Sequence, residues 1–128
     1  MSRNASAIQS TGDLVRYLTS YPEQVAFGDR PAEEVFDSYH TEDYLLVNDG
    51  IALDRQRLID HVGPARKRAS GVSVDVRDAL MEGDRVAARY ELTAEMRKGS
   101  RIVTEIHFFG RLAADGRLCR AEQLTRTP

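Results

Sequence analysis

The feature that most constrains this chain is a long alternation of apolar and polar side chains between residues 84 and 98. One parity of the segment is apolar and consists of Val86, Ala88, Tyr90, Leu92, Ala94 and Met96. The other parity is almost entirely charged or polar. This period of two predicts a β-strand with one buried and one solvated face. Because the segment far exceeds the usual ~5–6 residues of a strand, we expect it to bend and to give the sheet a concave apolar side that can hold a ligand.

Length and charge exclude several classes of protein. A chain of 128 residues fits one domain that buries roughly two-thirds of its unfolded surface. Its formal net charge of −2 offers no excess of positive charge for nucleic acid or for a membrane surface. No apolar run approaches the ~20 residues of a bilayer span, and residues 1–6 lack the apolar stretch of a secretory signal. With a single cysteine, Cys119, the composition fits a reducing compartment. We therefore expect a cytoplasmic protein with no nucleic-acid or membrane partner.

The first half of the chain predicts helices. Residues 1–10 are mostly small and polar and predict a flexible lead-in, followed by one domain over residues 11–128. Ser10 with Asp13 resembles a capping box and opens a helix that Pro22 either interrupts or restarts. A second helix follows Pro31.

The second half of the chain predicts mainly strands. Asp54 is suited to cap a third helix that runs to about Ala69. Strands are predicted at residues 43–47, 72–81, 84–98, 101–113 and 117–125, with turn signals containing glycine between neighbours. Short turns make consecutive strands antiparallel, and only the helices are available to cover the apolar face. The predicted fold class is α+β, with a cone-shaped, strongly bent antiparallel sheet wrapped around three helices.

Four segments carry a resemblance to a known family. They are Asp43–Gly50, Leu53–Ile59, Gly83–Tyr90 and Ala114–Leu118. Together with the order of elements, they make residues 11–125 similar to the nuclear transport factor 2-like superfamily (the cystatin-like roll), and within it to the SnoaL-like domains. That superfamily includes isomerases, dehydratases, cyclases, an epoxide hydrolase and non-catalytic binding domains, so the resemblance implies a fold without choosing an activity. It also implies a homodimer formed through the outer face of the sheet.

The resemblance suggests catalytic positions. In the ketosteroid isomerase branch, a carboxylate at the end of the first strand is the base, and Asp49 occupies that place. A helix tyrosine there donates a hydrogen bond to the oxyanion, a role open to Tyr17 or Tyr21. The second donor of that branch would fall at Phe108, which has no proton to donate. Residues 120–125 also lack the His-Trp and aspartate of the cyclase branch, so no complete catalytic set transfers.

Each polar candidate has a structural interpretation beside the functional one. Asp49 is either a base at the mouth of the cavity or part of an ordinary Asn48–Gly50 turn. His61 either exchanges protons in the cavity or is a half-buried helix residue. His40 ends a helix, where the dipole favours an imidazolium with a structural role. Glu122 points either into the pocket or into an ion pair. His107 lies either on the outer sheet face, which the strand parity favours, or in the pocket.

The sequence therefore predicts a small-molecule-binding domain with an apolar cavity. The expected ligand is small and mostly apolar, and the expected chemistry is cofactor-independent proton transfer, as in an isomerase, a cyclase or a dehydratase. Asp49, His61 and Tyr17 are the catalytic candidates. The ligand contacts are predicted at Tyr21, Phe36, Tyr39, Val86, Ala88, Tyr90, Leu92, Ile106, Phe108 and Glu122. No cofactor is expected, and no metal, because the histidines lack ligand spacing. The alternative is a non-catalytic binding or dimerisation domain that acts through the outer sheet face.

Overall fold

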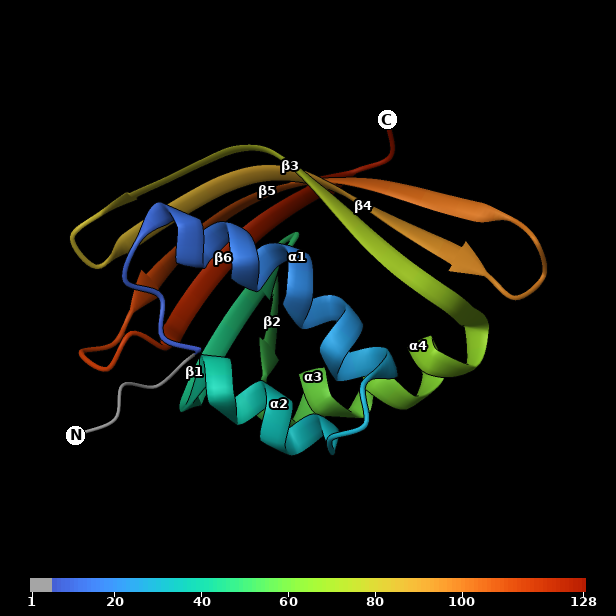
Figure 1. Ribbon diagram of the computed structural model, residues 1–128, viewed down its shortest axis with the longest axis horizontal. Helices are drawn as coiled ribbons and strands as arrows, with labels where there is room; N and C mark the ends of the chain where they lie inside the picture. Colours follow the sequence, from blue (N-terminus) through green and yellow to red (C-terminus); the bar gives the residue numbers. More distant parts are fainter. Residues whose placement is uncertain (1–5) are drawn as a thin grey trace.

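The sheet is built mainly from strands that follow one another in the chain. The computed structural model describes residues 6–128. Its four long strands, β3 (Ala69–Glu82), β4 (Arg85–Met96), β5 (Arg101–Leu112) and β6 (Leu118–Arg126), pair antiparallel in sequence order. This meander confirms the prediction from the turn signals. The sheet is strongly curled and arches over the helices, as predicted from the long alternating segment at residues 84–98 (Figure 1).

Two shorter strands extend the sheet beyond β6. Strand β1 (His40–Asn48) runs parallel to β6, and β2 (Ile51–Asp54) pairs antiparallel with β1, which gives the order β2-β1-β6-β5-β4-β3. The expectation of a purely antiparallel sheet is corrected at this one pair. The helices and strands between β1 and β6 form the long connection that a parallel pair needs. β2 was not predicted from the sequence.

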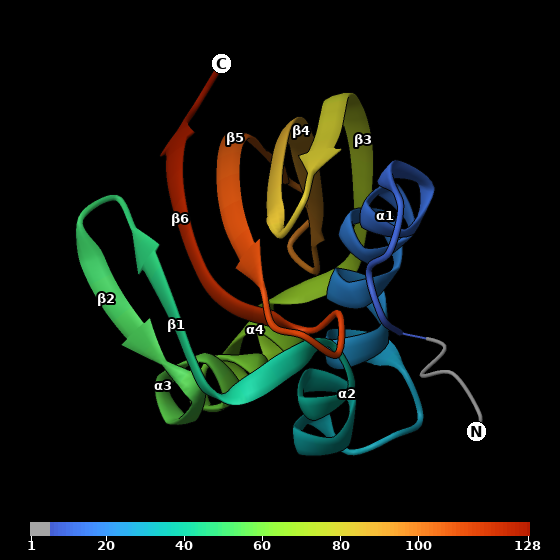
Figure 2. The same cartoon turned by 90° about the vertical axis from the view of Figure 1, so that its left-hand side faces the viewer.

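The helices lie on the concave side of the sheet (Figures 1 and 2). α1 (Thr11–Phe27) starts at the predicted cap, where Ser10 Oγ accepts a hydrogen bond of 3.1 Å from the backbone N–H of Asp13. Pro22 lies inside α1 without ending it. α2 (Ala32–Tyr39) leads directly into β1.

The single helix predicted from Asp54 to Ala69 is two short helices. α3 (Arg55–Asp60) and α4 (Val62–Arg68) are separated at His61. Pro64 explains the break, because it has no N–H to donate to the carbonyl of Asp60, whereas a proline is tolerated in the first turn of a new helix. The Asp54 cap itself is confirmed, since its carboxylate accepts from the backbone N–H of Arg57 at 3.0 Å.

A β-bulge in β6 changes which side chains face the helices. Leu112 pairs with Leu118, but the preceding residue of β5, Arg111, pairs with Arg120, so β6 carries one extra residue. Leu118 and Ala121 are consequently both buried, although they are three positions apart. Beyond the bulge, odd-numbered residues of β6 face inward.

The core lies between α1, α2 and the concave face of the sheet. Its fully buried side chains include Leu14, Phe36, Val86 and Leu118. A flexible lead-in was predicted for residues 1–10, and residues 1–5 of it lie outside the described residues. Within the described part, Ala7 and Ile8 are buried against the β5–β6 turn.

Candidate ligand-binding site

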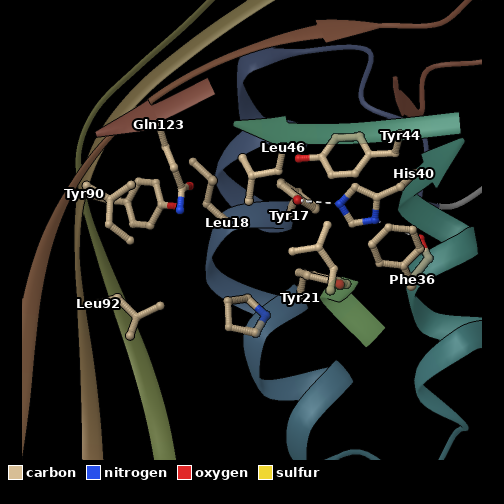
Figure 3. Close-up of a pocket in the computed structure, with 13 residues that line it drawn as sticks. Tyr17, Leu18, Tyr21, Phe36, His40, Tyr44, Leu46, Tyr90, Leu92 and Gln123 are labelled. Carbon is tan, nitrogen blue, oxygen red and sulfur yellow. Dashed lines mark hydrogen bonds between the residues drawn. The ribbon is translucent and has the colours of Figure 1, made fainter. Parts of the chain in front are cut away.

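A cavity of about 170 Å³ opens between α1, α2, β1 and the concave face of β4, β5 and β6 (Figure 3). Its lining is largely aromatic and aliphatic and consists of Tyr17, Leu18, Tyr21, Pro22, Phe36, His40, Tyr44, Leu46, Leu58, Tyr90, Leu92, Ile106 and Gln123. None of these lining residues carries a formal charge at neutral pH when His40 is neutral. The cavity therefore suits an uncharged, mostly apolar molecule.

Packed aromatic rings form one wall of the cavity. Tyr17 and Tyr21 lie one turn apart on α1 and their rings stack, with centroids 5.4 Å apart. The ring of His40 stacks on Phe36 at 4.3 Å and contacts Tyr44 at 4.5 Å. Because each ring is held by at least one other, the polar atoms that they carry have fixed positions.

The only histidine in this wall, His40, forms a buried hydrogen-bonded pair with Tyr17. Its Nδ1 lies 2.8 Å from the carbonyl oxygen of Phe36, and its Nε2 lies 2.7 Å from the hydroxyl of Tyr17. A carbonyl can only accept, so Nδ1 carries the proton and Tyr17 donates to Nε2. Burial lowers the pKa of His40 to about 4 and raises the pKa of Tyr17 well above its usual value.

Both members of this pair are therefore neutral at physiological pH. The imidazolium expected for His40 at the end of a helix is not formed, because His40 is only 1% exposed and desolvation outweighs the hydrogen bond to the Phe36 carbonyl and the negative charge of Asp37. The hydroxyl proton of Tyr17 is already committed to His40. The Tyr17 oxygen can still accept a hydrogen bond from a ligand.

Three other tyrosine hydroxyls face the cavity without a protein partner. Within residues 6–128, the hydroxyls of Tyr21, Tyr44 and Tyr90 make no hydrogen bond to the protein. In the same residues, every polar side-chain atom that is inaccessible to solvent has a hydrogen-bond partner. These hydroxyls must therefore contact open space, and all three residues line the cavity. Burial raises the pKa of each phenol, so each keeps its proton. The cavity thus offers three neutral donors to a ligand oxygen.

A second hollow of about 350 Å³ adjoins the cavity. It lies between α1, α3, α4 and the strands β3 and β4, and its lining is almost wholly apolar. The two spaces share four lining residues, namely Tyr21, Pro22, Leu58 and Leu92. His61, one of the predicted catalytic residues, lines this second hollow and not the tyrosine cavity.

The structure brings together about half of the predicted ligand contacts. Tyr21, Phe36, Tyr90, Leu92 and Ile106 all line the tyrosine cavity, as does the predicted catalytic residue Tyr17.

The remaining predicted contacts lie elsewhere. Val86, Ala88 and Phe108 are buried in the core outside the cavity lining. The Tyr39 ring packs behind Tyr17 at 5.3 Å, and its hydroxyl donates to Gln24. Glu122 is exposed on the convex face, because the bulge in β6 reverses the parity assumed for that strand.

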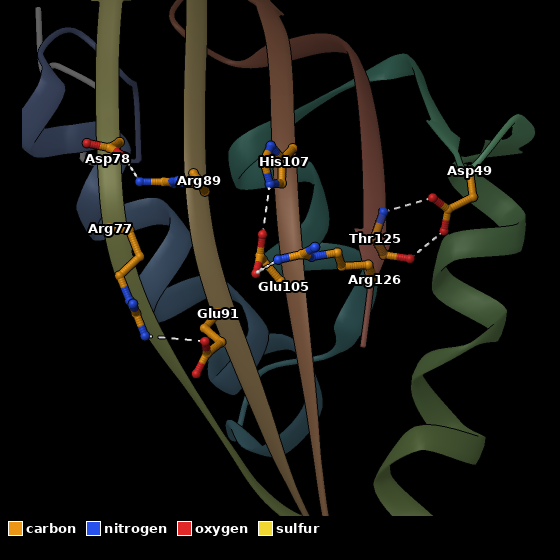
Figure 4. A network of polar contacts seen from close by, with 9 residues as sticks. All are labelled: Asp49, Arg77, Asp78, Arg89, Glu91, Glu105, His107, Thr125 and Arg126. Atoms are coloured by element: carbon orange, nitrogen blue, oxygen red, sulfur yellow. Dashed lines mark hydrogen bonds and ion pairs between the residues drawn. The ribbon is translucent and has the colours of Figure 1, made fainter. Parts of the chain in front are cut away.

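Asp49 lies at the surface in a tight turn (Figure 4). Asp49 and Gly50 both have positive φ, 50° and 84°, and connect β1 to β2 as a two-residue hairpin loop. The Asp49 carboxylate accepts hydrogen bonds from the backbone N–H of Thr125, at 2.8 Å, and from its hydroxyl. These bonds lower the pKa of Asp49. The Asp49 side chain lines neither the tyrosine cavity nor the second hollow. Asp49 is therefore placed as part of an ordinary Asn48–Gly50 turn and not as a base at the mouth of the cavity.

Sequence reasoning missed several lining residues. Tyr44 and Leu46 alternate on β1, and that period of two was a usable signal. Gln123 was hidden by the bulge; its Nε2 donates to Asn48 Oδ1 at 2.8 Å, which holds the side chain in place. His40 gave no local signal, because its role depends on Tyr17, which lies 23 residues away in sequence.

The fold and the cavity described above agree with a family match that covers most of the sequence. A family model described as the SnoaL-like domain matches residues 18–121. This chain belongs to the SnoaL-like domain family. The family resemblance stated from sequence is confirmed. No curated protein matches the chain.

Several solved structures share the SnoaL-like fold at low sequence identity. AclR from Streptomyces galilaeus, a proposed hydroxylase, has a TM-score of 0.70 and 13% identity over 91% of each chain. IdmH from Streptomyces antibioticus, a proposed polyketide cyclase, has a TM-score of 0.68 and 16% identity over 91% of this chain and 92% of its own. A protein with a ketosteroid isomerase-like fold from Catenulispora acidiphila, in complex with trimethylamine, has a TM-score of 0.63 and 10% identity over 86% and 82%. At these identities the likeness establishes the fold.

Residues 6–128 show neither a metal-binding cluster nor a membrane-spanning helix. No group of three or more His, Cys, Asp or Glu side chains in this part is placed to hold a metal ion. Among the same residues, no helix combines the length and the apolar character that crossing a membrane requires.

Proposed function

We propose that this SnoaL-like domain binds a small, mostly apolar organic molecule that carries a carbonyl oxygen, and that it does so in the tyrosine cavity. One observation carries the proposal: the hydroxyls of Tyr21, Tyr44 and Tyr90, which have no partner within residues 6–128, lie in a mostly apolar cavity. Phenol hydroxyls donate well to a ketone oxygen, and a hydrogen bond made away from water is stronger than one in water. An apolar cavity with a few convergent polar groups is the usual form of a small-molecule site.

The chemistry that fits the cavity is proton transfer next to the bound carbonyl, without a cofactor. Hydroxyls that donate to the carbonyl oxygen stabilise the negative charge that develops there when an α-proton leaves. The Tyr17 oxygen is the acceptor for that proton, while the hydroxyl proton of Tyr17 passes to Nε2 of His40. The products are then an enolate held by the tyrosines and an imidazolium at His40. Because the pKa of His40 is only about 4, this step depends on strong stabilisation of the oxyanion.

The proposal replaces Asp49 by the Tyr17–His40 pair as the proton-transfer group. Asp49 is bonded to Thr125 at the surface. The assignment is compatible with the proposed cyclase activity of IdmH, since ring closure of a polyketide also proceeds through enolised ketones. His61, in the second hollow, is placed to contact a longer ligand but lies outside the tyrosine cavity.

The binding proposal is tested with two molecules of nearly equal shape, acetophenone and ethylbenzene. Calorimetric titration should show that the wild type prefers the ketone by about tenfold, equivalent to ~1.4 kcal/mol. The Tyr21→Phe/Tyr44→Phe/Tyr90→Phe variant removes all three donors, keeps the rings that line the cavity, and should lose that preference. Equal affinity for the two molecules in the wild type, or no binding of either, contradicts the proposal.

The proton-transfer proposal is tested by exchange of the acetophenone methyl protons with D₂O, followed by ¹H NMR. Wild-type protein should accelerate the exchange, and Tyr17→Phe should abolish the acceleration. Asp49→Asn serves as the matched control and should leave the rate unchanged. A rate that falls with Asp49→Asn and persists in Tyr17→Phe would return the role to Asp49.

A second candidate function is homodimerisation through the convex face of the sheet. Leu80, Ala87, Phe109 and Glu122 form one row across β3, β4, β5 and β6. Leu80 and Phe109 are 60% and 53% exposed, and Leu124 lies beside them at 63%. Exposed large apolar side chains gathered on one face favour a protein partner.

Ion pairs lie beside this row on the same face of the sheet (Figure 4). Arg89 bonds Asp78, and Glu105 accepts from both His107 and Arg126. His107 therefore lies on the outer face, as the strand parity predicted. An apolar centre with a polar rim is the usual composition of an interface.

Sedimentation of two matched variants tests the dimer. Phe109→Glu should give a monomer, because it places a charge in the centre of the face. Ile51→Glu changes an equally exposed apolar residue on the edge strand β2 and should leave the dimer intact. A monomeric wild type, or a dimer that survives Phe109→Glu, excludes this face.

A further inference from the structure

The tyrosine cavity is too small to hold a typical ligand by itself. Pockets for drug-sized molecules usually measure about 300–1,000 Å³, whereas this cavity measures about 170 Å³. The second hollow adds about 350 Å³ and adjoins the cavity at the four residues that line both, Tyr21, Pro22, Leu58 and Leu92. The two spaces together reach the ordinary range.

The second hollow offers almost nothing but apolar surface to a ligand. Its side chains come from α1, α3, α4, β3 and β4, with Val25, Val62, Val72 and Ala94 among them. Ile102 pairs with Ala94 across the β4–β5 ladder and is 51% exposed on the same concave face. Apolar surface left open on a concave face next to a ligand cavity fits the apolar arm of the same ligand.

Positive charge gathers at the outer end of this hollow. The last turn of α4 carries Arg66, Lys67 and Arg68, directly between two lining residues, Ala65 and Ala69. The β4–β5 turn brings Arg97 and Lys98 to the same place, since the backbone N–H of Arg97 donates to the carbonyl of Arg68 at 2.8 Å. We call these five residues the basic rim.

The basic rim has no acidic partner in residues 6–128. Arg66 donates to the carbonyl of Ala26, itself a lining residue, and Arg97 contacts the carbonyl of Arg66. None of the five cations forms an ion pair with a carboxylate of that part of the chain. The nearby Glu95 is bonded by Arg101 at 2.9 Å. Unpaired cations next to residues that line an apolar hollow match a ligand with a negatively charged end.

We infer that the ligand is an elongated amphiphilic anion. Its carbonyl end lies among the tyrosines, its apolar arm fills the second hollow, and its anionic end lies at the basic rim. The inference rests on the proposed function and adds the length and the charge of the ligand. It commits to a free small molecule that occupies both spaces at once.

Three probes separate the parts of this inference by calorimetry at low salt. The first is acetophenone, which needs only the tyrosine cavity. The second is acetophenone with a para-alkyl chain that ends in a carboxylate, and the third has the same chain ending in a hydroxyl. Wild-type protein should bind the carboxylate probe at least tenfold more tightly than acetophenone, and more tightly than the hydroxyl probe. Raising the salt concentration should reduce only the advantage of the carboxylate.

Matched variants assign each gain in affinity to its site. Ala65→Trp fills the second hollow and should remove the advantage of both long probes while acetophenone binds as before. Lys67→Glu/Arg68→Glu should remove only the advantage of the carboxylate over the hydroxyl. Arg120→Glu, an exposed charge reversal on β6 outside both linings, should change nothing.

The outcomes distinguish the two proposals. If acetophenone binds but the long probes bind no more tightly, the inference is overturned and the proposed function stands. Equal binding of the carboxylate and hydroxyl probes overturns it as well, because the basic rim then recognises nothing. If acetophenone itself fails to bind, the proposed function fails, and the inference fails with it.

Discussion

Removing single hydroxyl groups from the tyrosines separates those that hold the fold from those kept for a ligand. Tyr17 donates to the buried Nε2 of His40 at 2.7 Å, whereas Tyr44 and Tyr90 donate to no atom of residues 6–128. Tyr17→Phe leaves Nε2 of His40 without a donor at a residue that is 1% exposed. An orphaned buried acceptor lowers the free energy of unfolding by about 1–3 kcal/mol. For a chain of this length, that loss lowers Tm by roughly 4 °C per kcal/mol.

Tyr44→Phe and Tyr90→Phe remove hydroxyls that make no hydrogen bond within the described part of the chain. Their free energies of unfolding should stay within ~0.5 kcal/mol of wild type. Because all three substitutions preserve the ring, no packing term complicates the comparison. Urea and thermal unfolding followed by circular dichroism measure the differences. A similar loss in all three variants, or a larger loss in Tyr90→Phe than in Tyr17→Phe, would refute the division between structural and ligand-facing hydroxyls.

Two further predictions concern the buried histidine and the glycines. The pKa of His40 is about 4 in the folded protein, whereas its ordinary value is 6.5. As the pH drops below 6.5, the unfolded chain therefore binds a proton at His40 before the folded protein does. The free energy of unfolding falls as a result. The free energy of unfolding should decrease by ~2 kcal/mol between pH 7.5 and pH 5, and urea titrations should show a much smaller decrease in His40→Gln; an equal decrease in both assigns the effect to other groups. Gly116→Ala should destabilise the fold by more than ~1 kcal/mol, because φ is +85° and the new Cβ would lie 2.8 Å from Cβ of Ala7. Gly63→Ala in α4 meets no neighbour and should instead stabilise by ~0.5–1 kcal/mol, and thermal unfolding that shows the same sign for both contradicts this account.

The fold was readable from the sequence because it rests on local periodicity. Alternation over residues 84–98 gave β4 and its inward side chains Tyr90 and Leu92, and turn glycines gave the meander. The capping positions Ser10 and Asp54 were also found, since a cap needs only a few neighbouring residues. The break at His61 was not predicted, because the helical spacing of apolar residues continues past Pro64 and gives no sign of a new helix start.

The site was only partly readable, because two of its determinants are not local. The bulge in β6 inserts one residue, and a one-residue shift moves every later side chain to the other face. Gln123 therefore lines the cavity, and Glu122 lies on the convex face. His40 is positioned by Tyr17 and Phe36, and nothing in the residues next to it in sequence announces that partnership. Asp49 looked like a base by family position, but its neighbour Gly50 and its partner Thr125 hold it in a surface turn.

The tyrosine ring signals offer the most direct test of the claim that free hydroxyls await a ligand oxygen. All five tyrosines of the chain lie in or behind the cavity wall, so a ¹H–¹³C spectrum of labelled rings reports on each. During titration with acetophenone, we expect saturable shifts for Tyr21, Tyr44 and Tyr90 and almost none for Tyr39, whose hydroxyl is bonded to Gln24. Spectra that stay unchanged at saturating ketone, or that change only at Tyr39, would contradict the claim.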